Sequence, residues 1–351
     1  MIKSSEISVI VQGAFDKKLT PVCLASIRKH LPDAEIILST WEDWDQKDYP
    51  RLPLDKIVLS PDPGGLIADE VHNVRNNVNR QILSTKAGLA HSTKPYSIKI
   101  RSDMTIEGTS FLKYFDRFPK RATDFCILKK RVIVSNLYTA HPKKTYFLFH
   151  PSDWFYFGLT EDVKNIWDIP LAPEPETSFW FKSRPRPLID RIPFWNARFL
   201  PEQYIWLSFL KKNGYKIKYR HITDYGEEQL INSELSLINN VIVLDYKRQL
   251  NVNFLKYNPY MHDAKNQQNH FYWLDQYKHY CDPGYCLPLR LQLENDRSFR
   301  RYRSRLIRFL NRFYQPFSRP LRWFFSFFIS FYWMVLFLAR ILLLWIKRKE
   351  N

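Results

Sequence analysis

The sequence predicts an α/β protein: a mixed, mostly parallel β-sheet flanked by helices, followed by a basic and apolar C-terminal tail. Short runs rich in β-branched residues alternate with longer runs whose apolar residues have helical spacing, which is typical of strand–helix–strand units. Four such short runs lie in the first 103 residues. With 351 residues, the chain can bury a sizeable core in one large domain or two ordinary ones.

The first predicted strand, Ile7-Ser-Val-Ile-Val-Gln-Gly13, is apolar and stops at a glycine, as a buried parallel strand does. The other three strands of the N-terminal half are predicted at Glu35–Thr40, Asp55–Ser60 and Tyr96–Asp103. The last of these ends abruptly in a carboxylate. Ligands of α/β proteins bind at the carboxyl edge of the sheet, so we expect Asp103 to lie at the functional site.

Two helices are predicted between these strands. Thr20 followed by Pro21 is typical of an N-cap and first helical position, and the helix should run to about His30. Apolar residues at helical spacing predict a second helix over Val74–Ala90. Pro61-Asp-Pro-Gly-Gly65 has the composition of a turn.

The second half of the chain is less regular. One or two strands are predicted within residues 125–136, and Thr160 should cap a short helix. Seven prolines and several aromatic residues between Pro170 and Pro201 predict an ordered, irregular insert. A helix should follow from Pro201 to Gly214, and then strand character over Tyr215–Ile222.

Charge and cysteine content place limits on compartment and partners. The chain carries 53 Lys and Arg against 35 Asp and Glu. Of the net charge of +18, +12 lies in residues 297–351, which hold 13 basic residues and one acidic residue. Cys281 and Cys286 have the spacing of a zinc-ligand pair, but no second pair completes a tetrahedral site. The few cysteines and the absence of a signal-peptide pattern predict a cytosolic body.

Several ordered strings resemble the GT-A glycosyltransferases, nucleotide-sugar-dependent enzymes with one Rossmann-like domain. That family has an apolar first strand, a polar helix start, a strand ending in a DxD motif, and an acidic helix start followed by Gly-Tyr. The corresponding strings here are Ile7-Ser-Val-Ile-Val, Asn79-Arg80-Gln81, Ile98-Lys-Ile-Arg-Ser-Asp103, Pro201-Glu202-Gln203 and Asn213-Gly214-Tyr215.

A closer resemblance is to the WavE lipopolysaccharide-synthesis family. It covers about residues 7–225 in six blocks: Val-Gln-Gly, Ser-Ile-Arg-Lys-His-Leu-Pro, Ile-Leu-Ser-Thr-Trp, Asp-Pro-Gly, Asn-Arg-Gln-Ile and Ile-Arg-Ser-Asp. The resemblance implies a GT-A-like catalytic domain over residues 1–225 that binds a nucleotide sugar, with the insert of residues 170–201 over its site. Residues 226–296 would be a C-terminal extension, and residues 297–351 a separate tail.

Asp103 takes the place of the DxD carboxylate, which in the family binds a divalent cation, Mn²⁺ or Mg²⁺, on the two phosphates of the donor. The first acid of the motif is replaced by Arg101. Three interpretations stay open: Asp103 binds the cation, Arg101 contacts a phosphate directly, or Asp103 caps a turn and pairs with Arg101. The pairing is feasible because positions 101 and 103 share one face of a strand.

The resemblance extends to other candidate residues for the nucleotide sugar: Gln12, Gly13, Asp62, Asn79 and Arg80. Each also has an ordinary structural explanation. Gln12 and Gly13 suit a strand–helix turn, Asp62 suits a proline-rich turn, and the other two suit a polar helix face.

The resemblance also implies a general base, Glu202, which would remove the proton of the acceptor hydroxyl. An acid in the first turn of a helix is equally explained by the helix dipole. His221 lies where some family members supply a metal ligand, and Asp153 and Trp154 are candidates for the acceptor side.

The tail predicts association with a membrane. Arg297–Leu310 has the pattern of a cationic amphipathic helix, and Trp323–Ala339 follows with 17 uncharged residues. A full span needs about 20 apolar residues, so the tail either spans or lies in the interface of an anionic membrane. We expect the protein at the cytoplasmic face of the inner membrane.

We therefore expect a glycosyltransferase that uses a nucleotide-sugar donor and a lipid-linked glycan acceptor, such as lipopolysaccharide core. One alternative is a non-catalytic, membrane-bound assembly protein of the same pathway. Another is a basic nucleic-acid-binding protein. The second alternative explains the arginines of the tail but not its unbroken Trp, Phe and Leu run, so we do not expect a nucleic-acid partner.

Overall fold

The computed structural model describes residues 2–44, 51–69, 73–186, 195–222, 224–256 and 266–286. These belong to one compact unit, Met1–Cys286. The predicted tail, residues 297–351, lies outside the described residues, as do residues 187–194 of the insert. Within the described part, no helix combines the length and the apolar character needed to cross a membrane.

A seven-stranded sheet forms the centre of the fold, in the order β10-β8-β9-β6-β1-β2-β3. Only β9 runs antiparallel to its neighbours, so the predicted mixed, mostly parallel sheet is confirmed. The strands are β1 (Ile7–Gln12), β2 (Glu35–Trp41), β3 (Lys56–Ser60), β6 (Tyr96–Arg101), β8 (Val132–Ser135), β9 (Phe155–Leu159) and β10 (Val241–Leu244).

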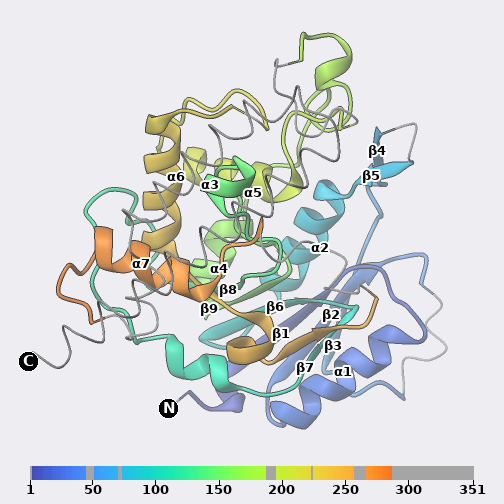
Figure 1. Ribbon diagram of the computed structural model, residues 1–351. Helices are drawn as coiled ribbons and strands as arrows, with labels where there is room; N and C mark the ends of the chain where they lie inside the picture. The colour runs from blue at the N-terminus through green and yellow to red at the C-terminus, as the bar shows by residue number, and fades with distance from the viewer. Residues whose placement is uncertain are drawn as a thin grey trace, which may run out of the picture. The chain divides into compact units, whose positions relative to one another are not determined.

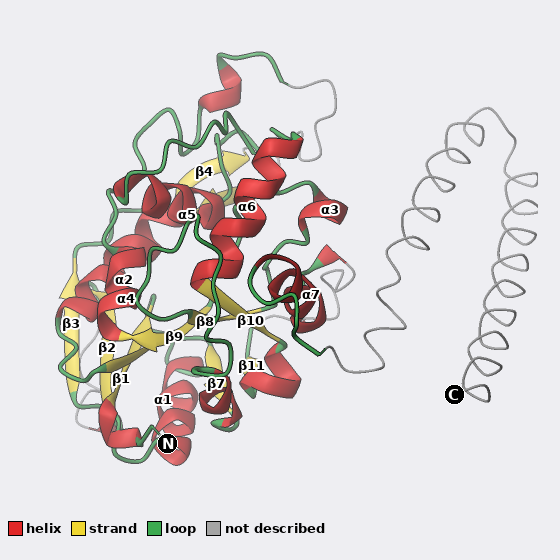
Figure 2. Ribbon diagram, turned by 90° about the vertical axis from the view of Figure 1, so that its left-hand side faces the viewer, coloured by secondary structure: helices red, strands yellow, loops and turns green. Residues whose placement is uncertain are grey.

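Helices cover both faces of this sheet (Figure 1, Figure 2). One layer holds α2 (Val78–Ala90), α4 (Thr160–Trp167) and α5 (Pro201–Lys212), which contact one another. The opposite face carries α1 (Leu19–His30) and a small antiparallel pair, β7 (Met104–Ile106) with β11 (Val252–Phe254). At the β10 edge lie α6 (Glu227–Asn240) and α7 (His270–Tyr280). A short α3 (Pro142–Thr145) and the hairpin β4 (Leu66–Asp69) and β5 (Val74–Asn76) complete the named elements.

The strand order reverses beside β1. The chain runs from β1 through α1 to β2 and then β3 on one side, and it returns to pair β6 with the other side of β1. Gln12 at the end of β1 is in register with Arg101 at the end of β6. Where strand order reverses in a parallel sheet, the connecting loops diverge and leave a crevice at the carboxyl ends of the strands.

The helix α1 begins slightly earlier than predicted, at Leu19, and its N-cap position is Lys18 rather than Thr20. Asp16 Oδ1 accepts hydrogen bonds from the backbone N–H groups of Lys18 at 2.8 Å and Leu19 at 3.0 Å. The Thr20 hydroxyl instead accepts the backbone N–H of Asp16 at 2.9 Å. An aspartate upstream therefore satisfies the first N–H groups of the helix.

The predicted strand over Tyr215–Ile222 is wrong. This segment has no strand partner among the described residues. Its alternating apolar residues pack against aromatic rings: Tyr215 stacks on Phe125 at 4.5 Å, and Tyr219 contacts Phe149 at 5.3 Å. Burial of alternate side chains against a cluster of rings gives the same period of two as a strand.

The sequence did not predict β9 and β10 of the central sheet or the short strands β4, β5, β7 and β11. Residues 74–76, expected to begin a helix, form β5, and α2 begins at Val78. The segment expected to be an extension after residue 225 supplies β10, the edge strand of the central sheet. The sheet therefore draws on residues 7 to 244.

The described part of the proline-rich insert packs on the hairpin rather than across the sheet. Phe181, Trp195 and Ala197 form a buried cluster with Ala68 of β4 and Ile222. The backbone N–H of Asn196 also donates to the Ala68 carbonyl at 2.8 Å. The described part of the insert is thus ordered, as predicted, and forms a lobe with β4 and β5.

Close packing of α2 on the sheet generates the first prediction. A Cβ at Gly88 would lie 2.5 Å from Ile10 Cγ2 and 3.0 Å from Ser39 Cβ. We expect Gly88→Ala to lower the free energy of unfolding by about 1–3 kcal/mol, because the helix must move away from β1 and β2. Urea-induced unfolding measures this. Ala90→Ser, exposed on the same helix, is the control, with an expected change within about 0.5 kcal/mol; equal stability of the two variants would contradict the prediction.

Candidate functional site

A cavity of about 820 Å³ lies at the carboxyl ends of β1, β2 and β6, where the strand order reverses. Its walls come from the loop after β1, the end of β2 and the loop after it, the start of α2, and the loop after β6. The predicted residues that line it are Gln12, Gly13, Asp62, Arg80, Arg101 and Asp103. The structure therefore brings together candidates that are as much as 91 positions apart in the chain.

The base of the cavity is closely packed backbone. Gly13 has φ of +121° and donates its N–H to Ser39 O at 3.1 Å. A Cβ at this position would lie 3.2 Å from the Ser102 hydroxyl oxygen, which itself donates to Ala14 O at 2.9 Å. The left-handed conformation and the short distance to the Ser102 hydroxyl both favour glycine, so backbone atoms and not a side chain border the cavity at this position.

Three buried polar atoms of residues that line the cavity have no partner among the described residues: Thr40 Oγ1, on a side chain with no exposed surface, Trp44 Nε1 and Gln81 Oε1. Gln12, by contrast, is held by the Ser84 hydroxyl, which donates to its Oε1 at 2.8 Å. Buried polar groups without partners are rare in native proteins because they cost free energy. All three atoms are enclosed by the protein itself, so a ligand in the cavity reaches them only if neighbouring side chains shift.

Arg80 and Asp62 form a two-bonded ion pair on one wall. Arg80 Nε donates to Asp62 Oδ1 at 2.7 Å, and Nη2 donates to Oδ2 at 2.5 Å. Arg80 Nη1 also reaches Asn77 Oδ1 at 3.2 Å. The hydrogen bond from Arg80 lowers the pKa of Asp62 and raises that of Arg80, so both groups are charged.

Arg101 and Asp103 form a second pair of the same kind. Arg101 Nε and Nη2 donate to the two carboxylate oxygens of Asp103 at 2.9 Å and 2.7 Å. The guanidinium group also lies over the Trp154 ring, 4.3 Å from its centre. Trp154 is in turn stacked on Tyr138 at 4.8 Å. The open interpretation in which Asp103 pairs with Arg101 is thus realised, and both residues still face the cavity.

Sequence reasoning missed the aromatic part of the cavity. Phe15 and Trp44 stack on each other with ring centres 4.4 Å apart, and both line the cavity together with the buried Trp41. Phe15 follows β1 and the two tryptophans lie at and after the end of β2, so their position just past strand ends was the available signal. Flat rings at a cavity wall can stack with a planar or sugar-like ligand.

Beneath Arg101, the same face of β6 carries a buried lysine. Lys99 has no exposed surface, donates from Nζ to the carbonyl oxygen of Asp153, and lies 4.7 Å from the centre of the Trp167 ring. Burial lowers the pKa of Lys99 to about 7, although the charge of Asp153 acts in the opposite direction. Asp153 is also buried, and its Oδ1 has no partner within the described chain.

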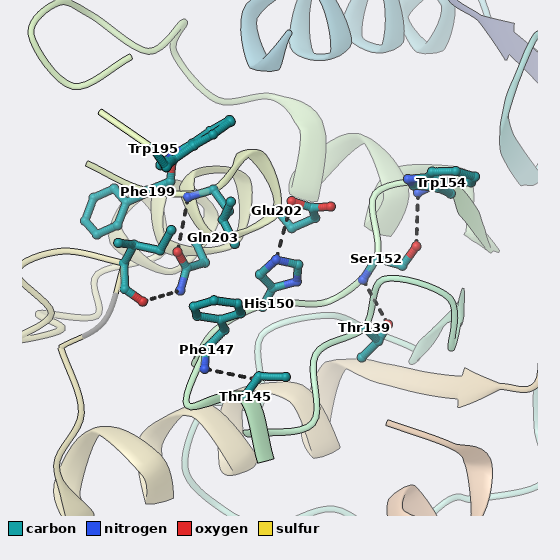
Figure 3. Close-up of polar contacts among 12 residues, drawn as sticks. Thr139, Thr145, Phe147, His150, Ser152, Trp154, Trp195, Phe199, Glu202 and Gln203 are labelled. Carbon is teal, nitrogen blue, oxygen red and sulfur yellow. Dashed lines mark hydrogen bonds and ion pairs between the residues drawn. The ribbon is translucent and has the colours of Figure 1, made fainter. Parts of the chain in front are cut away.

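Glu202, expected as general base, belongs to this buried group. It lies in the first turn of α5 with 8% of its surface exposed, and it is not part of the cavity lining. Its carboxylate faces His150 Nε2 at 3.5 Å (Figure 3). Burial, and then the charge of Asp153, raise the pKa of Glu202 well above its ordinary value. Burial lowers the pKa of His150 to about 4, so the histidine is neutral at pH 7.

A general base must lie within hydrogen-bond reach of the proton that it removes, and Glu202 is enclosed and outside the residues that line the cavity. Glu202 instead lies close enough to Arg101 for the positive charge of Arg101 to lower the pKa of Glu202, although the effect of burial is larger. Its neighbour Gln203 has a structural role: its amide donates to Leu148 O at 3.0 Å and to the Tyr219 hydroxyl at 2.9 Å.

Two predicted residues lie away from the cavity. The Asn79 amide exchanges two hydrogen bonds with the backbone of Ala172, at 2.7 Å and 3.0 Å, and so fixes the start of the insert. His221 contacts the Phe181 ring at 5.7 Å in the lobe of the insert. Neither residue lines the cavity, and the structure does not bring His221 to Asp103.

The donor set does not fit a divalent cation. Both oxygens of Asp103 accept from Arg101, and both oxygens of Asp62 accept from Arg80. In the described ranges, no group of three or more His, Cys, Asp or Glu side chains is arranged to hold a metal ion. Mg²⁺ and Ca²⁺ sites need about six oxygen ligands, several of them from carboxylates, substrate or water.

The buried lysine generates the second prediction. Between pH 7 and about 10 the unfolded chain binds a proton on Lys99 that the folded chain does not, so this residue makes stability rise with pH in that window. We expect Lys99→Met to lose this rise, at about 1.4 kcal/mol for each unit of pKa difference. Urea unfolding from pH 6 to 10 measures it. Lys86→Met, with 52% of the side chain exposed, is the control; parallel profiles for wild type and Lys99→Met would contradict a desolvated lysine.

Comparison with known families gives one match. The model of a family described as WavE lipopolysaccharide synthesis matches residues 7–315, which is most of the chain. The match includes every strand of the central sheet and every residue of the cavity. No curated protein matches the chain.

Proposed function

Because the chain belongs to the WavE lipopolysaccharide-synthesis family, we propose that it is a glycosyltransferase with a GT-A-like domain. It moves a sugar from a nucleotide-sugar donor to a lipid-linked glycan, such as lipopolysaccharide core. The observation that carries this proposal is the cavity at the strand reversal, with two arginines, stacked aromatic rings and unsatisfied polar atoms on its walls.

A nucleotide sugar matches each of these features. Its diphosphate is an anion that arginine guanidinium groups bind in a planar, two-bonded geometry. Its base and ribose carry polar edges suited to the partly exposed Gln81 side chain, and the base has a flat face suited to Phe15 and Trp44. Gly13 leaves the backbone open to close approach. The cavity of about 820 Å³ is in the size range of sites for cofactors and other small molecules.

In the transfer itself, the acceptor hydroxyl oxygen bonds to the anomeric carbon of the sugar while the bond from that carbon to the diphosphate oxygen breaks. The electron pair of the broken bond leaves with the diphosphate, and the hydroxyl proton passes to the departing diphosphate oxygen or to water. Cationic groups fixed at the diphosphate stabilise the negative charge that develops there. Arg101, clamped between Asp103 and Trp154, is suited to this role.

A second candidate, a non-catalytic assembly protein of the same pathway, is favoured by one observation. Glu202, the expected base, is buried and does not line the cavity. We place the protein at the cytoplasmic face of the inner membrane under either function, because a basic, aromatic tail suits a lipid-borne acceptor.

The third prediction tests donor use. The full chain should transfer sugar from one member of a panel of labelled nucleotide sugars to lipopolysaccharide extracted from cells that lack the protein. Gly13→Ala should weaken donor binding by about tenfold or more. An alanine at this positive φ is strained and its Cβ crowds the Ser102 hydroxyl, so the backbone must shift and the base of the cavity is displaced.

Gly214→Ala is the matched control. Gly214 also has positive φ, +89°, but a Cβ added there would meet no atom within 4 Å, and the residue closes α5 away from the cavity. Its donor affinity should equal that of wild type. Restoration of lipopolysaccharide in cells by a chain that transfers no sugar from any donor in the panel would establish the assembly function instead.

The fourth prediction concerns the tail. Replacing Arg300, Arg301, Arg303 and Arg305 by glutamine in the full chain should weaken its binding to anionic lipid vesicles. Each basic residue near such a surface contributes about 1 kcal/mol, so a loss of about two to three orders of magnitude is expected. Sedimentation with vesicles of anionic and of neutral lipid measures it. Equal binding of both vesicle types by wild type would contradict the electrostatic contribution.

A further inference from the structure

We propose that Arg80 and Arg101 bind the donor diphosphate directly, and that Asp62 and Asp103 orient these two arginines instead of holding a divalent cation. This inference rests on the proposed use of a nucleotide sugar. It adds that two arginines, and not a metal ion, neutralise the negative charge of the donor diphosphate. It assigns to Asp103 a role different from that of a DxD carboxylate.

The position of Arg101 is fixed on two sides. Asp103 accepts from one edge of its guanidinium group through Nε and Nη2, and the Trp154 ring covers one face. Trp154 is itself held, because its backbone N–H donates to Ser152 Oγ at 3.3 Å (Figure 3) and its ring stacks on Tyr138. A guanidinium group fixed in this way loses little conformational entropy when it binds an anion.

Arg80 is fixed in the same manner on another element. It lies in the first turn of α2, a helix of 13 residues, and its edge is taken by Asp62 while Nη1 reaches Asn77 Oδ1. Asp62 is in turn held by the backbone N–H of Gly64 at 2.9 Å. Since the N-terminal turn of a helix carries partial positive charge, Arg80 and the start of α2 act on an anion with the same sign.

The two pairs line one cavity, so they form two guanidinium sites that a ligand with two phosphates can engage together. Lys17 and Lys256 also line this cavity, and Asp16 and Asp43 balance their charge. Arg101 and Arg80 each direct two of their five N–H donors to a carboxylate. A cation on Asp103 or Asp62 would have to replace an arginine already bonded to both oxygens, which separates two opposite charges in a partly buried site.

Binding of nucleoside diphosphates to the full-length protein tests this arrangement. Calorimetry with UDP, GDP, CDP and ADP would be run in EDTA and again with Mn²⁺. We expect one of these probes to bind in EDTA, with an affinity that Mn²⁺ changes by less than about threefold. Arg101→Met and Arg80→Met should each weaken binding by about ten- to a hundredfold, as expected for loss of a charge-assisted hydrogen bond.

The conservative variants separate the two possible roles of the carboxylates. Arg101→Lys keeps the positive charge but loses the planar group that makes two parallel hydrogen bonds. Its affinity for the nucleoside diphosphate should therefore lie between those of wild type and Arg101→Met. Asp103→Asn should weaken binding by less than tenfold, because it only loosens the arginine. Arg198→Met is the control for lost charge: Arg198 pairs with Glu176 at 2.5 Å in the insert and is outside the cavity lining. Its affinity should match wild type.

The outcomes distinguish this inference from the function on which it rests. Binding that requires Mn²⁺ and is abolished by Asp103→Asn would overturn the arginine site while leaving a nucleotide-sugar transferase in place. Binding in EDTA that neither arginine variant weakens would also overturn it. No binding of any of the four diphosphates, with or without Mn²⁺, would overturn the proposed donor use itself.

Discussion

The burial of β1 between β2 and β6 is the constraint on which the rest of the structure depends. All six of its residues are buried, and the chain must pair both of its edges with strands that follow later in the sequence. The strand order reverses at β1, and at such a reversal the loops at the carboxyl ends of the neighbouring strands diverge and do not close over it. The cavity, the exposed backbone at Gly13 and the facing ends of β1 and β6 all follow from this arrangement.

The same constraint explains why charged groups reach the interior. One face of β6 carries Ser97, Lys99 and Arg101 at alternate positions, and this face is covered by the layer that contains α4 and α5. Ser97 is satisfied by the Thr160 hydroxyl at 2.7 Å, and Lys99 by the Asp153 carbonyl. Of these three, Arg101 at the end of the strand is the one that lines the cavity. The side chains on this face of β6 thus change from a hydroxyl at Ser97 to the basic groups of Lys99 and Arg101 as the strand approaches the cavity.

The buried group behind Arg101 has a cost in stability. Lys99, Asp153 and Glu202 are almost fully enclosed, and burial disfavours the charged forms of Lys99 and Glu202. Proteins rarely retain such groups in the core without a function. These three residues lie beneath the Arg101–Asp103 pair. We infer that they are kept there because they affect the position and the charge of that pair in the cavity.

The sequence by itself determined the α/β class, the first four strands of the sheet, the helix after Pro201 and six of the residues that line the cavity. These follow from local patterns: β-branched runs, caps and polar residues at strand ends. The tertiary structure decided that Asp103 bonds to Arg101, that Asn79 holds the insert and that Glu202 lies behind the cavity. It also placed β10 in the sheet and left Tyr215–Ile222 outside it. The reason is physical: a sequence pattern records which side chains are buried or polar, whereas partners and protonation depend on groups brought close only when distant segments pack.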